Sequence, residues 1–189
     1  MILVLLGTQD KPFTRLLDTI QECIDKKVIS ERVVVQAGHT KYDSKDMEIF
    51  DLLSKDEYDE FIKSANLLIV HGGVSSIFDG LKNDIPVIAV PRLKKYGEHT
   101  NDHQLQIIKK FNDEKYIIGV DDCNKLEDAI KKVKKFKFEK FESNTENLIK
   151  EIESFIDKNE VKLRIKKCII VLFVIFLIWY IIILPLYVK

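Results

Sequence analysis

The chain has 189 residues, and its 30 basic and 30 acidic side chains give a formal net charge of zero. This length corresponds to one ordinary domain, and the balanced charge gives no electrostatic support for nucleic acid as a partner. The three cysteines lie at no metal-binding or redox spacing, and an odd number argues against a disulfide framework. A reducing compartment is the simpler interpretation.

Short apolar segments alternate with segments of helical periodicity along most of the chain. The predicted strands are, in chain order, residues 2–7, 32–38, 47–53, 66–73, 85–90 and 116–120. The first predicted helix follows Pro12, and the later ones cover residues 55–65, 75–83, 102–111, 124–136 and 144–157. Almost wholly apolar strands that alternate with helices predict an α/β fold, with a Rossmann-like parallel sheet covered on both faces.

The C-terminus differs in kind, because residues 168–188 carry no charge. As a helix this segment would span about 31 Å, which matches a hydrocarbon core of roughly 30 Å. A buried core helix is the alternative, but a domain this small cannot surround a helix that is apolar on every face. Four basic residues precede the segment and only Lys189 follows it, which predicts a single-pass anchor with the N-terminal part cytoplasmic. We therefore predict a domain at residues 1–158, a basic linker at 159–167 and a transmembrane helix at 168–188.

Three polar or glycine-bearing segments follow predicted strands, namely residues 7–10 (GTQD), 71–76 (HGGVSS) and 91–104 (PRLKKYGEHTNDHQ). Ligands of a parallel α/β sheet bind beyond the carboxyl ends of its strands, so these segments are the candidate binding loops. None of them contains the G-x-G-x-x-G fingerprint, which disfavours nicotinamide cofactors, and no Walker A pattern occurs. The absence of an Asp-x-Asp triplet gives little support for a bound divalent metal.

The HGGVSS segment has the composition of an anion-binding turn. Gly72 and Gly73 permit a sharp turn or a close approach of the backbone to a ligand. Ser75 and Ser76 begin the next predicted helix, whose free N–H groups and positive dipole end favour an anion such as a diphosphate. Asp79 shares a helix face with Ser75, and a carboxylate there can accept hydrogen bonds from a ribose diol. The alternative is a serine-capped helix with a surface aspartate.

The segment at residues 91–104 is the richest in polar side chains, which are Arg92, Lys94, Lys95, Glu98, His99, Asp102, His103 and Gln104. A loop of this composition at the start of a helix suits phosphate and sugar hydroxyl groups. A zinc site at His99 and His103 is an alternative that lacks a thiolate or a third histidine. His39 and His71 are single histidines at strand ends, which are more often structural than catalytic.

Residues 71–104 resemble the donor-binding signature of the glycosyltransferase family 28 C-terminal domain. The nearest branch contains the PssE-type, one-domain catalytic subunits of two-part transferases, including the one that extends dolichol-linked N-acetylglucosamine. The resemblance covers roughly residues 1–150 and includes LVLLGTQDKPFTRLL near the start. It implies the C-terminal half of a GT-B glycosyltransferase, which binds a UDP-sugar and depends on neither a metal nor a cofactor.

The resemblance also implies roles for individual residues. Thr8 and Gln9 would lie near the phosphates, and Asp79 would bind the ribose hydroxyls. Together with the loop residues named above, the predicted donor-binding set is Gly7, Thr8, Gln9, His71, Gly72, Gly73, Ser75, Ser76, Asp79, Arg92, Glu98, His99, Asp102, His103 and Gln104. The sequence departs from the family in three ways: Asp79 replaces the usual glutamate, His-Gly-Gly replaces His-Ala-Gly, and the apolar tail is unusual.

The predicted reaction is an inverting transfer from a UDP-sugar to a polyprenyl-linked lipid acceptor, as in capsule, exopolysaccharide or glycolipid synthesis. N–H groups at a helix start, together with Arg92 or Lys94, would stabilise the leaving diphosphate. Because the sequence contains only one sheet, we expect a membrane-associated, PssD-type acceptor-binding partner to supply the other wall of the cleft and the general base. Candidate bases from this chain are His71, His39 and His99.

Two further functions fit the same sequence. A non-catalytic subunit would anchor a partner transferase at the membrane, and the shortened acid and the apolar tail favour this function. Hydrolysis or epimerisation of a nucleotide sugar is known among GT-B relatives, but such epimerases carry both halves in one chain. Retention of the GEHTNDHQ cluster favours catalysis over anchoring.

Overall fold

The computed structural model describes residues 1–158 and 161–179. The chain divides into two compact units, Met1–Phe141 and Glu142–Lys189. The first unit contains the sheet and every predicted binding loop, and the described residues of the second form two helices. The units are described separately below.

The first unit is built on six parallel strands, as the alternation of apolar and helical segments predicts. The strands are β1 (Ile2–Leu5), β2 (Val33–Gln36), β3 (Met47–Phe50), β4 (Leu67–His71), β5 (Val87–Val90) and β6 (Ile118–Gly119). Their order in the sheet is β3-β2-β1-β4-β5-β6, and each neighbouring pair is parallel. This is the strand order of a Rossmann sheet, in which the direction of winding reverses between β1 and β4.

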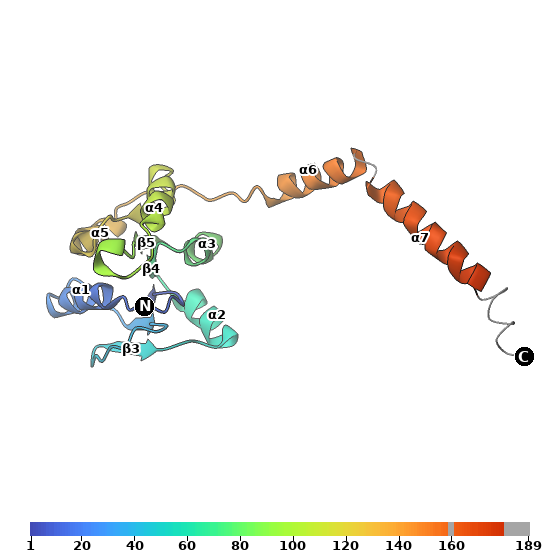
Figure 1. Cartoon of the computed structure of the whole chain (residues 1–189). Coiled ribbons are helices and arrows are strands. Elements are labelled where there is room, and N and C mark those ends of the chain that lie inside the picture. The colour runs from blue at the N-terminus through green and yellow to red at the C-terminus, as the bar shows by residue number, and fades with distance from the viewer. Residues whose placement is uncertain (159–160, 180–189) are drawn as a thin grey trace, which may run out of the picture. The chain divides into compact units, whose positions relative to one another are not determined.

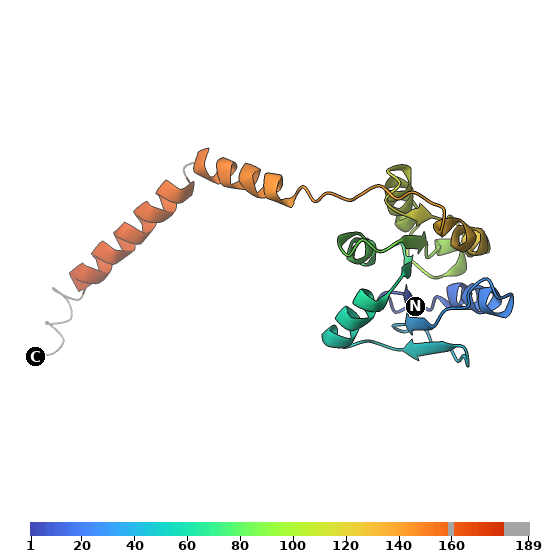
Figure 2. The same ribbon diagram turned by 180° about the vertical axis from the view of Figure 1, so that it is seen from behind.

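Helices cover both faces of the sheet, as Figures 1 and 2 show from opposite sides. The helices are α1 (Thr14–Asp25), α2 (Lys55–Ser64), α3 (Val74–Lys82), α4 (His103–Asp113) and α5 (Leu126–Val133). Apolar residues of α1 and α5 form one core cluster with alternate strand residues, and those of α2, α3 and α4 form the other. Strand residues that point to either face are therefore buried, which explains why the strands are almost wholly apolar.

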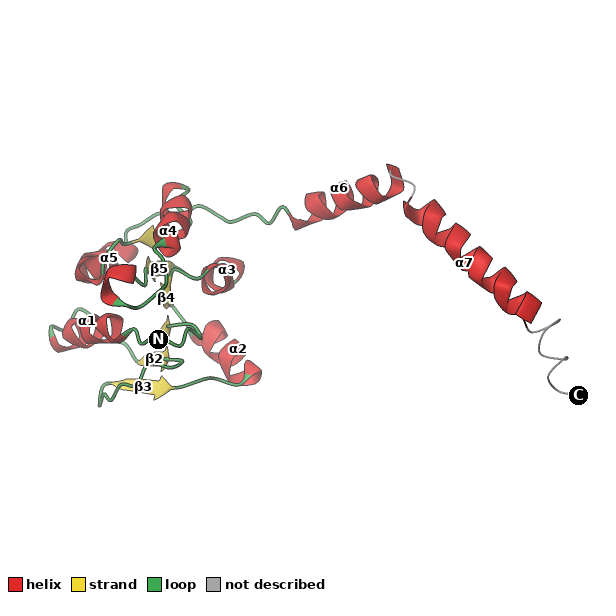
Figure 3. Cartoon of the chain, in the orientation of Figure 1, coloured by secondary structure: helices red, strands yellow, loops and turns green. Residues whose placement is uncertain are grey.

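Two local features fix where α2 begins. Ser54 accepts a hydrogen bond from the backbone N–H of Glu57, and the Glu57 side chain accepts one from the backbone of Ser54, which forms a capping box. The preceding connection from β2 to β3 contains no helix (Figure 3). Helix α2 follows β3 after the short turn at residues 51–54, and it starts at the carboxyl edge of the sheet.

The segment after α5 belongs to the first unit. The helix ends at Val133, earlier than the predicted 124–136 helix. Phe136 and Phe138 then pack against the core cluster of α1 and α5. Phe141 packs edge-on against Phe78, with ring centroids 5.1 Å apart. This aromatic packing explains why the compact unit extends to residue 141.

The second unit contains α6 (Thr145–Lys158) and α7 (Val161–Ile178). The helix expected at residues 144–157 is confirmed by α6. The predicted linker at residues 159–167 is helical from Val161 onward. Within residues 1–158 and 161–179, no helix is both long and apolar enough to cross a membrane. Residues 180–188 of the predicted span lie outside the described residues.

Candidate functional site

The three predicted binding loops meet at one edge of the sheet. GTQD follows β1, HGGVSS extends from the last residue of β4, and the segment at residues 91–104 follows β5. These strands are neighbours in the sheet, and β1 and β4 lie on either side of the reversal in winding. The structure therefore brings the three loops together at the position where Rossmann-like sheets bind their ligands.

His71 fills the space between the first two loops. A Cβ atom on Gly7 would lie 2.6 Å from its imidazole ring, and one on Gly73 would lie 2.3 Å from Nε2. Gly7 also has a φ of 73°, a left-handed conformation that favours glycine. Both glycines are therefore required by their packing around His71, whether or not a ligand approaches them.

The protonation state of His71 follows from its surroundings. Nδ1 lies 3.2 Å from the carbonyl oxygen of Leu5, so Nδ1–H donates and Nε2 keeps its lone pair. Burial lowers the pKa of His71 to about 4, although the hydrogen bond to Leu5 opposes this shift. The imidazole is thus neutral at neutral pH, beside the loops predicted to hold phosphate.

Helix α3 begins without a side-chain cap. Its N-cap residue is Gly73, and neither Ser75 nor Ser76 accepts a capping hydrogen bond. Ser75 is exposed, and Ser76 is half-buried. The serine-capped helix considered as an alternative is therefore not found. The first turn of α3 presents its backbone N–H groups at the carboxyl edge of the sheet, in the arrangement that suits an anion.

Asp79 has a partner that the sequence analysis missed. The hydroxyl of Tyr58, in the first turns of α2, donates a hydrogen bond of 2.6 Å to Asp79 Oδ2. Both side chains are half-buried. The only sequence signal for Tyr58 was its position near the start of a predicted helix, which gave no indication of a contact with α3.

Arg92 is the largest fully buried side chain of the described residues. Its guanidinium donates to the carbonyl oxygens of Leu6, at 2.8 Å, and Lys11, at 2.6 Å. It also stacks on the ring of Phe13, with 4.9 Å between Cζ and the ring centroid. Burial lowers the pKa of Arg92 to about 10, so the group stays charged at neutral pH. The structure thus places Arg92 inside the unit, where it fixes the chain on both sides of GTQD.

Glu98 and Gln104 are also buried, with 4% and 7% of their surfaces exposed. Glu98 accepts hydrogen bonds from Arg15 Nη2, at 2.8 Å, and from the backbone N–H of Leu93, at 3.0 Å. Gln104 accepts one of 2.9 Å from the backbone N–H of Arg92. These contacts close the loop at residues 91–104 upon itself and join it to α1. Arg15, which makes the ion pair, was not among the predicted residues.

The remaining predicted residues are more open to solvent. Thr8, Ser75, Asp102 and His103 are exposed, while Gln9 and His99 are partly buried. Asp102 accepts a hydrogen bond of 2.8 Å from the backbone N–H of Lys94. Within the described part of the chain, no group of three or more histidine, cysteine or acidic side chains is placed to hold a metal. Contact of each residue with a nucleotide sugar stays a prediction.

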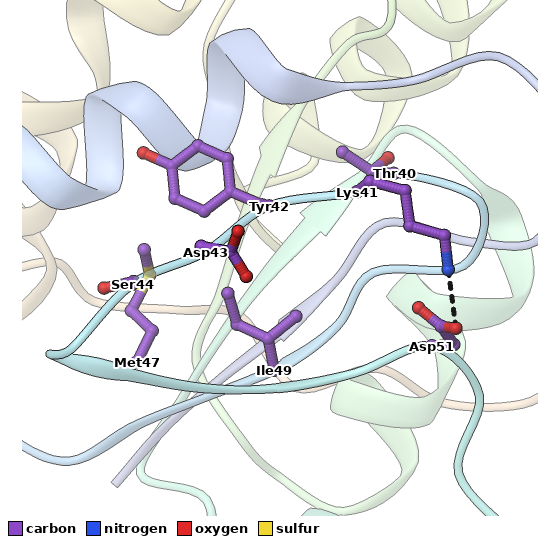
Figure 4. Close-up of a pocket in the computed structure, with 8 residues that line it drawn as sticks. All are labelled: Thr40, Lys41, Tyr42, Asp43, Ser44, Met47, Ile49 and Asp51. Carbon is purple, nitrogen blue, oxygen red and sulfur yellow. Dashed lines mark hydrogen bonds and ion pairs between the residues drawn. The ribbon is translucent and has the colours of Figure 1, made fainter.

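A separate hollow of about 870 Å³ lies between the loop that precedes β3 and β3 itself (Figure 4). It is lined by Thr40, Lys41, Tyr42, Asp43, Ser44, Met47, Ile49 and Asp51. An ion pair of 2.7 Å between Lys41 and Asp51 lies at its rim. None of the predicted donor-binding residues lines this hollow, so the candidate site is the loop cluster at β1, β4 and β5.

Several solved structures resemble this chain. The UDP-GlcNAc 2-epimerase of Methanocaldococcus jannaschii, in complex with UDP-GlcNAc and UDP, aligns with a TM-score of 0.56 and 16% identity, over 82% of this chain and 45% of the epimerase. The solution structure of ALG13 aligns with a TM-score of 0.52 and 20% identity, over 75% of this chain and 89% of ALG13. The glycosyltransferase SnogD from Streptomyces nogalater aligns with a TM-score of 0.50 and 13% identity, over 70% of this chain and 34% of SnogD.

At these identities the likeness shows a shared fold, that of the Rossmann-like C-terminal domain of GT-B enzymes. The chain spans less than half the length of the epimerase and of SnogD. No curated protein matches its sequence. The sequence model of the glycosyltransferase family 28 C-terminal domain, however, matches residues 1–159. The chain therefore belongs to the family of glycosyltransferase family 28 C-terminal domains.

Proposed function

We propose that the first unit binds a UDP-sugar at the carboxyl edge of β1, β4 and β5, as the donor-binding subunit of a two-part inverting glycosyltransferase. The observation that carries the proposal is the convergence of three loops on the start of α3, a helix that has no side-chain cap. Asp79 lies further along the same helix. A diphosphate at the helix start with a ribose near Asp79 would use both features.

Two groups would stabilise negative charge on the leaving diphosphate. The N–H groups at the start of α3 are fixed in place before the reaction, which makes them effective in a partly desolvated site. Lys94 follows β5 and is the more accessible cationic candidate, because its side chain is exposed whereas Arg92 is enclosed in the interior. This arrangement requires no metal.

The acceptor side of the reaction is assigned to a partner. In a GT-B enzyme the donor and the acceptor react in a cleft between two domains, each built on its own sheet. The first unit of this chain has one sheet. We propose a PssD-type partner that binds a polyprenyl-linked acceptor and supplies the general base. His71, His39 and His99 are the candidate bases from this chain. The apolar segment at residues 168–188 would anchor the chain beside such a lipid and raise its effective concentration there.

Nucleotide binding by the full-length chain in detergent is the first test. Isothermal titration with UDP is expected to show saturable heat at micromolar to millimolar UDP. The Asp79→Ala variant is expected to bind UDP more weakly with an unchanged far-UV circular dichroism spectrum. Asp113→Ala is the matched control, since Asp113 is exposed and pairs with Lys109 at the far end of α4. Absence of heat at millimolar UDP would contradict the proposal.

One observation favours the anchoring subunit as a second candidate. Glu98 and Gln104, which belong to the GEHTNDHQ cluster, hold loops together inside the unit. A scaffold would also need them, so their retention does not by itself demonstrate catalysis. Purification of the chain together with its partner from native membranes distinguishes the catalytic function from the anchoring function. If the partner is recruited by the Asp79→Ala variant but sugar transfer is lost, the chain is catalytic; if transfer is unchanged, it is an anchor.

A further inference from the structure

The contact between Tyr58 and Asp79 joins two helices at the edge of the sheet that carries the candidate site. Both α2 and α3 begin at this edge and pack on the same face of the sheet. The ring of Tyr58 lies against that core cluster. Its backbone N–H donates to Ser54, within the turn fixed by the capping box. The hydroxyl of Tyr58 is therefore held in place beside Asp79 by backbone and by packing.

The hydrogen bond leaves Asp79 with one free oxygen. Oδ2 accepts from Tyr58 at 2.6 Å, and Oδ1 accepts no hydrogen bond from any residue that the structure describes. Burial, and next the hydrogen bond to Asp79, raise the pKa of Tyr58, so its hydroxyl stays protonated and continues to donate. A ribose diol presents two hydroxyl donors. Asp79 Oδ1 is open to one of them, and the phenolic oxygen of Tyr58, 2.6 Å beyond Oδ2, is a further acceptor placed beside the short side chain of Asp79.

The tyrosine hydroxyl can provide the second acceptor. A phenolic oxygen donates one hydrogen and still accepts another through its lone pairs. We propose that Tyr58 and Asp79 form a joint ribose site, in which Asp79 Oδ1 accepts one ribose hydroxyl and Tyr58 Oη accepts the other. The phenolic hydrogen stays on Asp79 Oδ2. Tyr58 thereby extends the acceptor surface of an acid whose side chain is one methylene shorter than glutamate.

This inference rests on the proposed function and adds a residue to its site. The test measures the affinity of the full-length chain for UDP, 2′-deoxy-UDP, 3′-deoxy-UDP and 2′,3′-dideoxy-UDP. The native chain is expected to lose affinity for both monodeoxy nucleotides. Tyr58→Phe is expected to bind UDP roughly three- to tenfold more weakly, the loss of one hydrogen bond. The affinity of Tyr58→Phe should also no longer depend on one of the two ribose hydroxyls. Its affinity for the dideoxy nucleotide should equal that of the native chain.

The control and the rescue use matched variants. Tyr116→Phe removes a hydroxyl from a ring that packs against Phe111 and Phe141, away from the predicted binding loops. It should leave the affinity for all four nucleotides unchanged. Tyr58→Phe/Asp79→Glu is expected to regain sensitivity to both hydroxyls, because the glutamate side chain is one methylene longer and reaches towards the position that the phenolic oxygen occupies in the native chain.

The outcomes are distinguishable from a failure of the proposed function. If the native chain binds no UDP, the proposed function fails and this inference fails with it. If the native chain binds UDP but Tyr58→Phe shows the native pattern for all four nucleotides, only the joint site is wrong. An equal loss for all four nucleotides, the dideoxy form included, would make Tyr58 a structural residue and would overturn the joint site as well.

Discussion

Two sets of polar residues lie side by side at the carboxyl edge of the sheet, and they differ in burial. The inner set consists of Arg92, Glu98 and Gln104, which are almost completely enclosed and are bonded mainly to backbone and to Arg15. The outer set consists of the predicted donor-binding residues whose side chains are exposed, such as Ser75 and His103. Both sets come from segments that the sequence marks equally as binding loops. Polar composition alone therefore does not separate residues that shape a site from those that are free to contact a ligand.

The difference has an energetic consequence. A buried charged group costs several kcal/mol to desolvate, and hydrogen bonds must compensate most of that cost. Removal of Arg92 leaves buried carbonyl groups without a donor. Removal of Glu98 or Gln104 leaves buried N–H groups without an acceptor. Removal of an outer residue returns exposed surface to water at little cost. Stability measurements should therefore respond to the inner set, and nucleotide affinity to the outer set.

The largest effect is expected for Arg92→Met. The substitution fills part of the volume but leaves the buried carbonyl oxygens of Leu6 and Lys11 without their donors. We expect the free energy of unfolding to fall by about 3 kcal/mol, measured by urea denaturation of the full-length chain. Lys94→Met in the same loop is the control, and it should leave the free energy of unfolding unchanged because Lys94 is exposed.

An unaltered stability of Arg92→Met would contradict the division into two sets. It would mean that the guanidinium contributes nothing to the loop at residues 7–10 in solution. In that case Arg92 would return to the predicted role of a phosphate ligand. The UDP affinity of the variant would then have to fall instead, without a change in stability.

The second effect concerns His71, which packs between Gly7 and Gly73. Its native pKa of about 4 is below the value of about 6.5 expected in the unfolded chain. Between these values the unfolded state binds more protons than the native state, so the free energy of unfolding decreases as the pH is lowered from about 6.5 to about 4. We expect this group to contribute a loss of about 3 kcal/mol over that interval.

The His71 prediction is checked by two measurements. An NMR titration of the His71 ring in the folded chain should show an apparent pKa well below the ordinary histidine value. Urea denaturation at several pH values should show a weaker acid dependence for His71→Gln than for the native chain. If the ring titrates near 6.5, the packing between the two glycine turns is looser than the structure shows.

The sequence was sufficient to predict the sheet, but not this division of its loops. Continuous apolar runs such as residues 2–6 predict strands buried on both faces, and alternation with helices predicts a parallel sheet. The position of the candidate site followed from the same argument, since loops at the carboxyl ends of neighbouring strands must meet. These predictions depend on local pattern and on general topology.

The remaining features depend on contacts between distant segments. Charged residues are seldom fully buried, so the sequence favoured an open Arg92; its burial depends on carbonyl groups more than 80 positions earlier in the chain. The bond between Tyr58 and Asp79 requires the spacing of α2 and α3, which no periodicity encodes. Phe136 was predicted to be the last residue of a helix, and its packing against the core cluster accompanies an earlier end of that helix at Val133.

The smallest effect is expected for Ser75→Ala, which tests the outer set. Ser75 is exposed and does not cap α3, so its removal should change the free energy of unfolding by less than about 0.5 kcal/mol. The affinity for UDP should fall only about threefold, because the backbone N–H groups of the first turn remain. Ser30→Ala, an exposed serine in the loop before β2 at the opposite edge, should change neither quantity. A loss of stability above 1 kcal/mol would show that Ser75 caps the helix in solution, and would move it into the inner set.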